Sequence, residues 1–186
     1  EARQELDRWI RSELHSTIRK VTDALDDYEP QEAARPIAEL IDQLSNWYVR
    51  RSRRRFWKSD DSADTQAALH TLYECLSTLS HLLAPFTPFL AEALHRNLVA
   101  KHLPNVPSSV HLADWPEIDP NAIDEKLSSD FKAVQRLVSL GRAARSKAGI
   151  KVRQPLAITV LVPRSVTERE ALGRHTEQIA DELNVK

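Results

Sequence analysis

The sequence predicts a mainly α-helical fold, an up-and-down helical bundle followed by a small, incomplete α/β appendage. Apolar residues recur every three or four positions through most of the chain, which is typical of amphipathic helices. Only 3 glycines occur in 186 residues. One short run, residues 156–162 after Pro155, has the β-branched composition of a strand. We therefore expect the bundle over residues 1–148 and the appendage over residues 149–186.

Two long helices open the predicted bundle. The first covers residues 3–27, where leucine, isoleucine and valine recur at helical spacing. The second begins near Gln31 and reaches about Trp57. Pro36 would fit better in a first turn, which favours a later start. The polar residues 58–64 that follow include serines and aspartates that are candidate N-caps for the next helix.

Further helices and a proline-rich segment complete the predicted order. A third and a fourth helix flank the Pro-Phe-Thr-Pro break at residues 85–88. Residues 101–120 contain four prolines, and we expect them to pack along the bundle without regular structure. A fifth helix follows over residues 123–147 and stops at Gly149. A sixth is expected over residues 167–183.

The most distinctive stretch is residues 45–58, at the end of the second predicted helix. Five arginines and one lysine lie between Arg50 and Lys58 with no acid among them, and four aromatic residues are interspersed through the stretch. Arginine binds phosphate through a bidentate fork and stacks on bases. Aromatic rings stack on unpaired bases as well. This combination indicates a surface that binds single-stranded or looped nucleic acid.

Helical geometry divides this stretch into two faces. Arg51 and Arg55 point toward the core, where we expect them to pair with acids of neighbouring helices. A cation-rich helix end can also be only a solvated end that suits the helix dipole, but the tryptophans favour binding. The side chains expected on the exposed face, opposite the apolar stripe, are Asn46, Arg50, Arg53, Arg54 and Trp57.

A second basic block lies between Phe131 and Thr167. It holds eight cations and no acid, although the net charge of the chain is only −1. Such asymmetry of charge is typical of a nucleic-acid-binding protein. The cations of both stretches that we expect to contact phosphate, beyond those of the exposed face, are Lys58, Arg142, Arg145, Lys147, Lys151 and Arg153.

Composition excludes several other classes of protein. Cys75 is the only cysteine, so no intrachain disulfide can form, and it is expected in the core. No apolar run approaches the length of a membrane span, and no signal peptide is visible. We expect a cytoplasmic monomer without membrane contact. The absence of methionine and the unpaired strand favour a piece of a longer protein.

Residues 46–57, Asn-Trp-Tyr-Val-Arg-Arg-Ser-Arg-Arg-Arg-Phe-Trp, resemble the signature helix in the anticodon-binding region of isoleucyl-tRNA synthetases. Residues 82–89, 109–116 and 140–156 resemble further motifs of that family, in the same order. The resemblance covers nearly the whole chain. It implies a helical bundle of the class I synthetase type whose partner is the anticodon stem-loop of the isoleucine tRNA.

The resemblance also implies that the catalytic and editing domains, with ATP and Mg²⁺, lie in other parts of the intact protein in cis. The chain itself has no glycine-rich phosphate loop and neither ATP-site signature of class I synthetases. We expect no catalytic residue, metal site or cofactor here. Lysines and arginines would contact phosphates, while Asn46, the exposed arginines and Trp57 would contact bases. The alternative is a helical protein-interaction module whose arginines bind an acidic partner, and only RNA binding predicts discrimination among tRNAs.

Overall fold

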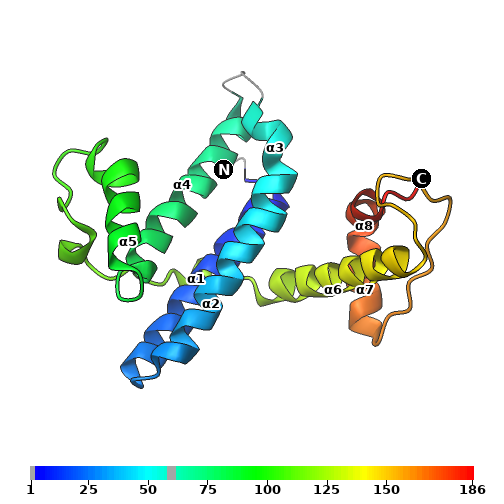
Figure 1. Ribbon diagram of the computed structural model, residues 1–186, viewed down its shortest axis with the longest axis horizontal. Helices are drawn as coiled ribbons and strands as arrows, with labels where there is room; N and C mark the ends of the chain where they lie inside the picture. The colour runs from blue at the N-terminus through cyan, green and yellow to red at the C-terminus, as the bar shows by residue number, and fades with distance from the viewer. Residues whose placement is uncertain (1–2, 58–61) are drawn as a thin grey trace. The chain divides into compact units, whose positions relative to one another are not determined.

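The computed structural model describes residues 3–57 and 62–186, and Figure 1 shows it as mainly α-helical. The mainly α fold class is thereby confirmed. The chain divides into two compact units, Glu1–Asp124 and Glu125–Lys186. We expected a boundary at residue 148, but the helix that precedes this residue packs with the helices after it and belongs to the second unit.

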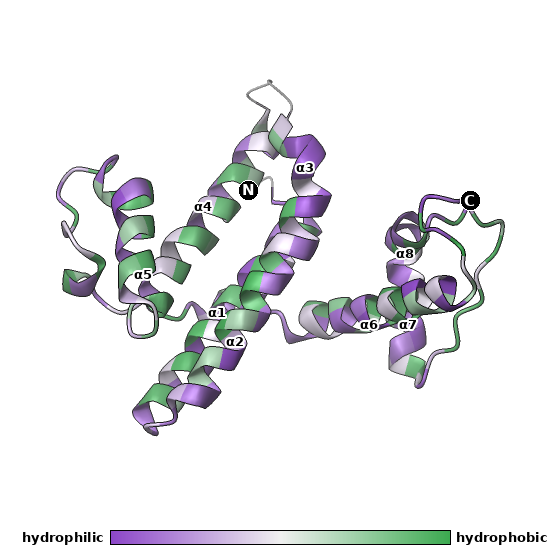
Figure 2. Ribbon diagram, viewed as in Figure 1, coloured by the Kyte–Doolittle hydropathy of each residue, from purple (hydrophilic) through white to green (hydrophobic). Residues whose placement is uncertain are grey.

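The first unit is built around a long helical hairpin (Figure 1). Its helices bury an apolar stripe against one another, as their spacing predicts. Figure 2 shows that α3, in contrast, is mostly hydrophilic. The elements of this unit are α1 (Glu5–Asp26), α2 (Pro30–Gln43), the π-helix η1 (Leu44–Val49), α3 (Arg50–Trp57), α4 (Ala63–Leu83), α5 (Pro88–His95), the π-helix η2 (Arg96–Ala100), and the 3₁₀ turns η3 (Val110–Leu112) and η4 (Pro120–Ala122).

The second predicted helix exists, but it begins earlier than Pro36. Pro30 occupies the first turn of α2, where a missing N–H has no cost. Pro36 lies inside the helix and is buried. Ala33, buried one turn before Pro36, belongs to the same apolar face as Ile37. Tertiary packing of this face therefore holds the first turns of α2 in helix despite the proline.

The Arg-rich stretch continues α2 without a break through η1 into α3. The π-helical turn at Leu44–Val49 widens the helix locally, as π-bulges do within α-helices. It buries Leu44, Trp47 and Tyr48 together, and Ser52 and Arg55 continue the buried side in α3.

Predicted features at the other helix ends are confirmed. Ser62 caps α4, because its hydroxyl accepts a hydrogen bond from the backbone N–H of Thr65. The proline-rich segment packs along the first unit as expected, where Val110 is buried and Trp115 Nε1 donates to Thr22 Oγ1 at 2.8 Å. It was expected to lack regular structure, but η3 forms a 3₁₀ turn within it. No helix in the described part of the chain is long and apolar enough to cross a bilayer.

The second unit contains α6 (Glu125–Lys147), α7 (Val166–Arg174) and α8 (Thr176–Leu183). Gly149, with φ +70°, follows the end of α6 as predicted. The single helix expected over residues 167–183 is instead two helices, which meet at the non-helical backbone of His175.

The predicted strand after Pro155 does not form a strand in the described chain. Leu156 makes one isolated parallel bridge with Val185. Its N–H donates to the Asn184 carbonyl and its carbonyl accepts from the Lys186 N–H, both at 2.9 Å. A β-strand needs a partner along its length, and Val185 supplies one for a single residue.

Candidate nucleic-acid interface

The inner side of α3 is anchored by a buried ion pair. Both terminal nitrogens of Arg55 donate to the two carboxylate oxygens of Asp7 in α1, each at 2.8 Å. The Tyr48 hydroxyl donates to the same carboxylate at 2.7 Å, and Arg55 also pairs with Asp64 at 2.8 Å. Asp7 is completely buried. The prediction that Arg55 turns inward and pairs with acids is confirmed, while Arg51 is half-buried and its pairing stays a prediction.

The protonation states in this anchor follow from its geometry. Burial alone would raise the pKa of Asp7, but hydrogen bonds from Arg55 and Tyr48 outweigh burial and hold the pKa below its usual 3.8. Burial and the bond to Asp7 raise the pKa of Tyr48 well above its ordinary value. At neutral pH an ionised Asp7 therefore receives hydrogen bonds from a neutral Tyr48 and a charged Arg55. Arg53 and Trp57 lie two positions before and after this anchored Arg55.

The outer side of η1 and α3 carries the side chains that were predicted to bind RNA. Trp57 is 71% exposed, and the guanidinium carbon of Arg53 lies 3.9 Å from the centroid of its ring. Such a cation–π contact orients the indole without burying it. Trp47, in contrast, is buried and contributes to the core. All five predicted residues of this face are exposed: Asn46, Arg50, Arg53, Arg54 and Trp57.

Asn46 makes contacts that were not predicted from the sequence. Its side-chain Nδ2 donates to Asp42 Oδ1 at 2.6 Å, and its backbone carbonyl accepts from Arg50 Nε at 2.8 Å. Asp42 lies four residues before Asn46, a spacing that places two side chains on one side of a helix. This spacing was the sequence signal that could have identified Asp42 as the hydrogen-bond partner of Asn46.

The second basic block separates into exposed and structural cations. Lys147, Lys151 and Arg153 are exposed, and in residues 3–57 and 62–186 none of them forms an ion pair. Arg142 pairs with the buried carboxylate of Glu182 in α8. Lys58, predicted to contact phosphate, lies outside the described residues.

Arg145 was also predicted to contact RNA, but the structure places it inside the second unit, where it is only 4% exposed. Its guanidinium donates to the carbonyl of Leu183 at 3.1 Å and to that of Lys151 at 2.6 Å, and also to the carbonyls of Val152 and Gln154. It thus satisfies backbone carbonyls of the extended segment and of the end of α8. A guanidinium used in this way is not available to phosphate.

Residues 7–160 match the family described as the anticodon-binding domain of tRNA ligase. The chain belongs to this family. Three of its curated relatives are isoleucine–tRNA ligases. The ligase of Dehalococcoides mccartyi is 54% identical over 182 residues, which are 98% of this chain and 18% of the relative. That of Thermus thermophilus is 49% identical over 187 residues, 100% of this chain and 18% of the relative. That of Streptomyces avermitilis is 49% identical over 181 residues, 97% of this chain and 16% of the relative.

The family match confirms the resemblance that the sequence motifs indicated. This anticodon-binding domain spans less than a fifth of the length of those relatives, as the shares of 16% and 18% state. In the described part of the domain, no group of three or more His, Cys, Asp or Glu side chains is arranged to hold a metal ion.

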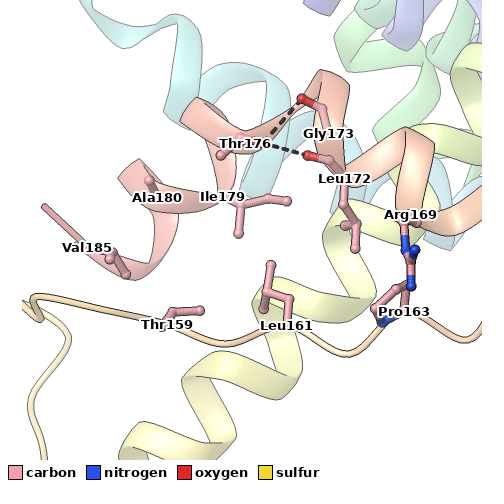
Figure 3. A pocket seen from close by; sticks show the side chains of 10 residues that line it. All are labelled: Thr159, Leu161, Pro163, Arg169, Leu172, Gly173, Thr176, Ile179, Ala180 and Val185. Carbon is pink, nitrogen blue, oxygen red and sulfur yellow. Dashed lines mark hydrogen bonds between the residues drawn. The ribbon is translucent and has the colours of Figure 1, made fainter.

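A groove of about 390 Å³ lies inside the second unit, between the extended segment and the helices α7 and α8 (Figure 3). Figure 3 shows Leu161 of the extended segment pointing toward Leu172 and Ile179. The lining is mainly apolar, and Arg169 is its one charged residue. The groove therefore offers little to a phosphate backbone, and the exposed face of η1 and α3 has the chemistry that nucleic-acid binding requires.

Proposed function

We propose that this domain is the anticodon-binding part of an isoleucine–tRNA ligase and that the outer side of η1 and α3 binds the anticodon loop of the isoleucine tRNA. The family match and the isoleucine–tRNA ligases among its relatives support this proposal. In the intact ligase the other domains would use ATP and Mg²⁺ to attach isoleucine. This domain would hold the anticodon end of the tRNA while the acceptor end reacts in the catalytic domain.

The observation that supports the binding surface most directly is the exposed indole of Trp57 held by Arg53. An exposed aromatic ring offers a face on which one unpaired base can stack, and such stacking is worth roughly 1–3 kcal/mol. Arg55, between these two residues in sequence, is hydrogen-bonded to the buried Asp7 of α1. A base splayed out of the anticodon loop would meet a surface already in place.

Contacts to phosphate would complete the interface without reading sequence. Arg50 and Arg54 accompany the Arg53–Trp57 pair on the exposed side of the helix. Lys58 is expected to extend this surface. In the second unit, the cations proposed to contact phosphate are the exposed Lys147, Lys151 and Arg153. Arg142 would contribute less, because its charge is already balanced by the ion pair with Glu182.

The alternative function, a protein-interaction module that binds an acidic partner, is not favoured by the family match. The two functions differ in one measurable property. Only binding of an anticodon makes the affinity depend on the anticodon bases of an otherwise identical tRNA.

Replacement of Trp57 tests the proposed surface. We expect Trp57→Ala to reduce the difference in binding free energy between the isoleucine tRNA and the same tRNA with a replaced anticodon by roughly 1–3 kcal/mol. Trp57→Phe should retain most of the difference, because a phenyl ring still stacks. The measurement is the affinity of the full-length protein for both RNAs. An equal loss of affinity for both RNAs would make Trp57 a general adhesive contact, and absence of any preference in the unaltered protein would refute the anticodon-binding assignment.

A further inference from the structure

Asp42 is an acid on a surface proposed to bind a polyanion. Its side chain is exposed near the end of α2, four residues before Asn46. Across residues 3–57 and 62–186 no lysine, arginine or histidine pairs with it, so its negative charge is not balanced by an ion pair. Repulsion from RNA phosphates should weaken binding. The Asp42 carboxylate accepts a hydrogen bond from the side-chain amide of Asn46.

The contact with Asp42 determines which way round the Asn46 amide lies. A side-chain amide has an oxygen that accepts and a nitrogen that donates, and the two ends are nearly the same size. An ionised carboxylate only accepts hydrogen bonds. The nitrogen of Asn46 must therefore face Asp42, because the flipped amide would place two acceptors against each other. In the structure Asn46 Nδ2 lies 2.6 Å from Asp42 Oδ1.

The backbone of Asn46 is restrained as well. Arg50 Nε donates to the Asn46 carbonyl at 2.8 Å, so the residue is held from the turn before it and from the turn after it. It lies in the π-helical η1, which is flanked by α2 and α3. After the bond to Asp42, the amide retains one N–H and the oxygen for a ligand.

The remaining pair, one donor and one acceptor in a set order, suits a base edge that offers an acceptor beside a donor. Adenine, with N7 and the N6 amino group, is one base with such an edge, and asparagine reads it through two hydrogen bonds. An amide free to flip would present the reverse order equally well. Discrimination between bases therefore depends on whatever prevents the flip.

We propose that Asp42 is a positioning residue for anticodon recognition. It orients the Asn46 amide so that its donor and acceptor face the base in one order, and the domain gains specificity at the expense of some electrostatic attraction. This inference rests on the proposed function, because it assumes that Asn46 contacts a base of the anticodon loop.

Three substitutions in the full-length protein separate orientation from charge. Asp42→Asn removes the charge and introduces an amide that can pair with either end of Asn46. Asp42→Glu keeps an acceptor-only carboxylate. Glu39→Gln is the matched control, because Glu39 is an exposed acid of the same helix without a hydrogen bond to Asn46. For each protein the measured quantity is the ratio of dissociation constants for the anticodon-replaced and the unaltered isoleucine tRNA.

We expect Asn46→Ala to lower this ratio by about 5- to 150-fold, the effect of removing a bidentate interaction with a base. Asp42→Asn should lower it toward the value of Asn46→Ala while the anticodon-replaced tRNA binds more tightly. Asp42→Glu should preserve the ratio. Glu39→Gln should strengthen binding of both RNAs and leave the ratio unchanged.

The outcomes distinguish this inference from the function on which it rests. If Asn46→Ala lowers the ratio and Asp42→Asn does not, Asp42 has no positioning role. The same conclusion holds if Glu39→Gln lowers the ratio as much as Asp42→Asn, because loss of charge would then account for the effect. If Asp42→Glu lowers the ratio as much as Asp42→Asn, an acceptor-only carboxylate at this position does not set the ratio, and the positioning role fails as well. If Asn46→Ala leaves the ratio unchanged, Asn46 reads no base, and it is the proposed role of Asn46 that fails.

Discussion

At the scale of single residues, Arg53 and Arg55 show how one residue type serves two purposes within one turn of helix. Arg55 turns inward to the buried Asp7 and is nearly covered, whereas Arg53 lies exposed against the ring of Trp57. A buried ion pair costs desolvation of both charges, which the paired geometry and additional hydrogen bonds offset. Loss of one partner leaves the other charge buried and alone. Stability and binding are thus assigned to arginines two positions apart.

This division predicts very different costs for two matched substitutions. Arg55→Ala should lower the free energy of unfolding by about 3–5 kcal/mol, since it leaves Asp7 buried without its cation. Arg53→Ala, on the exposed side, should change it by less than about 0.5 kcal/mol. Urea denaturation followed by circular dichroism measures both. Equal losses for the two variants would contradict the assignment of Arg55 to the anchor.

Two acids with lowered pKa values, the half-buried Glu74 and the buried Asp7, also predict how stability depends on pH. Burial opposes ionisation of Glu74, but His15, Arg11 and Arg3 outweigh it and lower the pKa of Glu74 from 4.5 to about 2. The pKa of Asp7 is lowered as well. A carboxyl group whose pKa is lower in the folded state stabilises the protein above its unfolded pKa and loses this effect as the pH falls.

Stability should therefore decline as the pH falls from about 4.5 toward 2, the interval between the unfolded and folded pKa values of Glu74. Urea midpoints at a series of pH values test this, with Glu74→Gln as the comparison. The variant should be less stable at neutral pH and should show a shallower decline over the same interval. A decline as steep as that of the unaltered protein would mean that other acids cause it.

At the scale of elements, the continuous helix from α2 through η1 to α3 owes its position to one apolar side. Leu44 is 4% exposed, whereas Ile41, an apolar residue three positions before it, is 40% exposed. Leu40 is 1% exposed and takes the core position in this turn. A stripe of apolar residues identifies the buried side of a helix but not which residue at its margin is covered, because the neighbouring helices decide that.

Two truncations in this helix test its phase. Leu44→Ala should cost about 2–5 kcal/mol, as expected for a large residue removed from a packed core. Ile41→Ala should cost less than about 1 kcal/mol, since much of its side chain already contacts water. The urea midpoints of both variants, compared with that of the unaltered protein, measure these two costs. If Ile41→Ala proved the more damaging change, the side of the helix assigned to the core would be incorrect.

At the scale of the whole molecule, the predicted cations are distributed over both compact units. Those of α3 accompany an exposed indole and an oriented amide, whereas those after residue 145 accompany no exposed aromatic ring. The first group has the chemistry to distinguish bases, and the second has only charge. We expect the second unit to contribute affinity without specificity.

Substitution of Lys147 or Lys151 by alanine should weaken binding of all tRNAs alike. Removal of one cation that pairs with a phosphate should flatten the slope of log affinity against log salt concentration by roughly 0.7–0.9. Lys20→Ala, which removes an exposed lysine of α1 outside both basic stretches, should leave the slope unchanged. If the Lys20 variant flattened the slope as much as the Lys151 variant, the effect would reflect net charge and not a direct interaction with phosphate.

The sequence by itself determined the helical class, most helix ends and the exposed face from Asn46 to Trp57, because these follow from periodicity, caps and local charge within one or two turns. Tertiary structure decided the rest. Whether a cation is free to contact RNA or is used in packing depends on residues distant in sequence. Arg145 lies near exposed lysines in sequence, yet its guanidinium donates to backbone carbonyls up to 38 residues away. Likewise, no local pattern shows that Arg55 pairs with Asp7, 48 residues before it. Residues 156–162 have strand composition without a strand, since pairing needs a neighbouring segment that composition cannot provide.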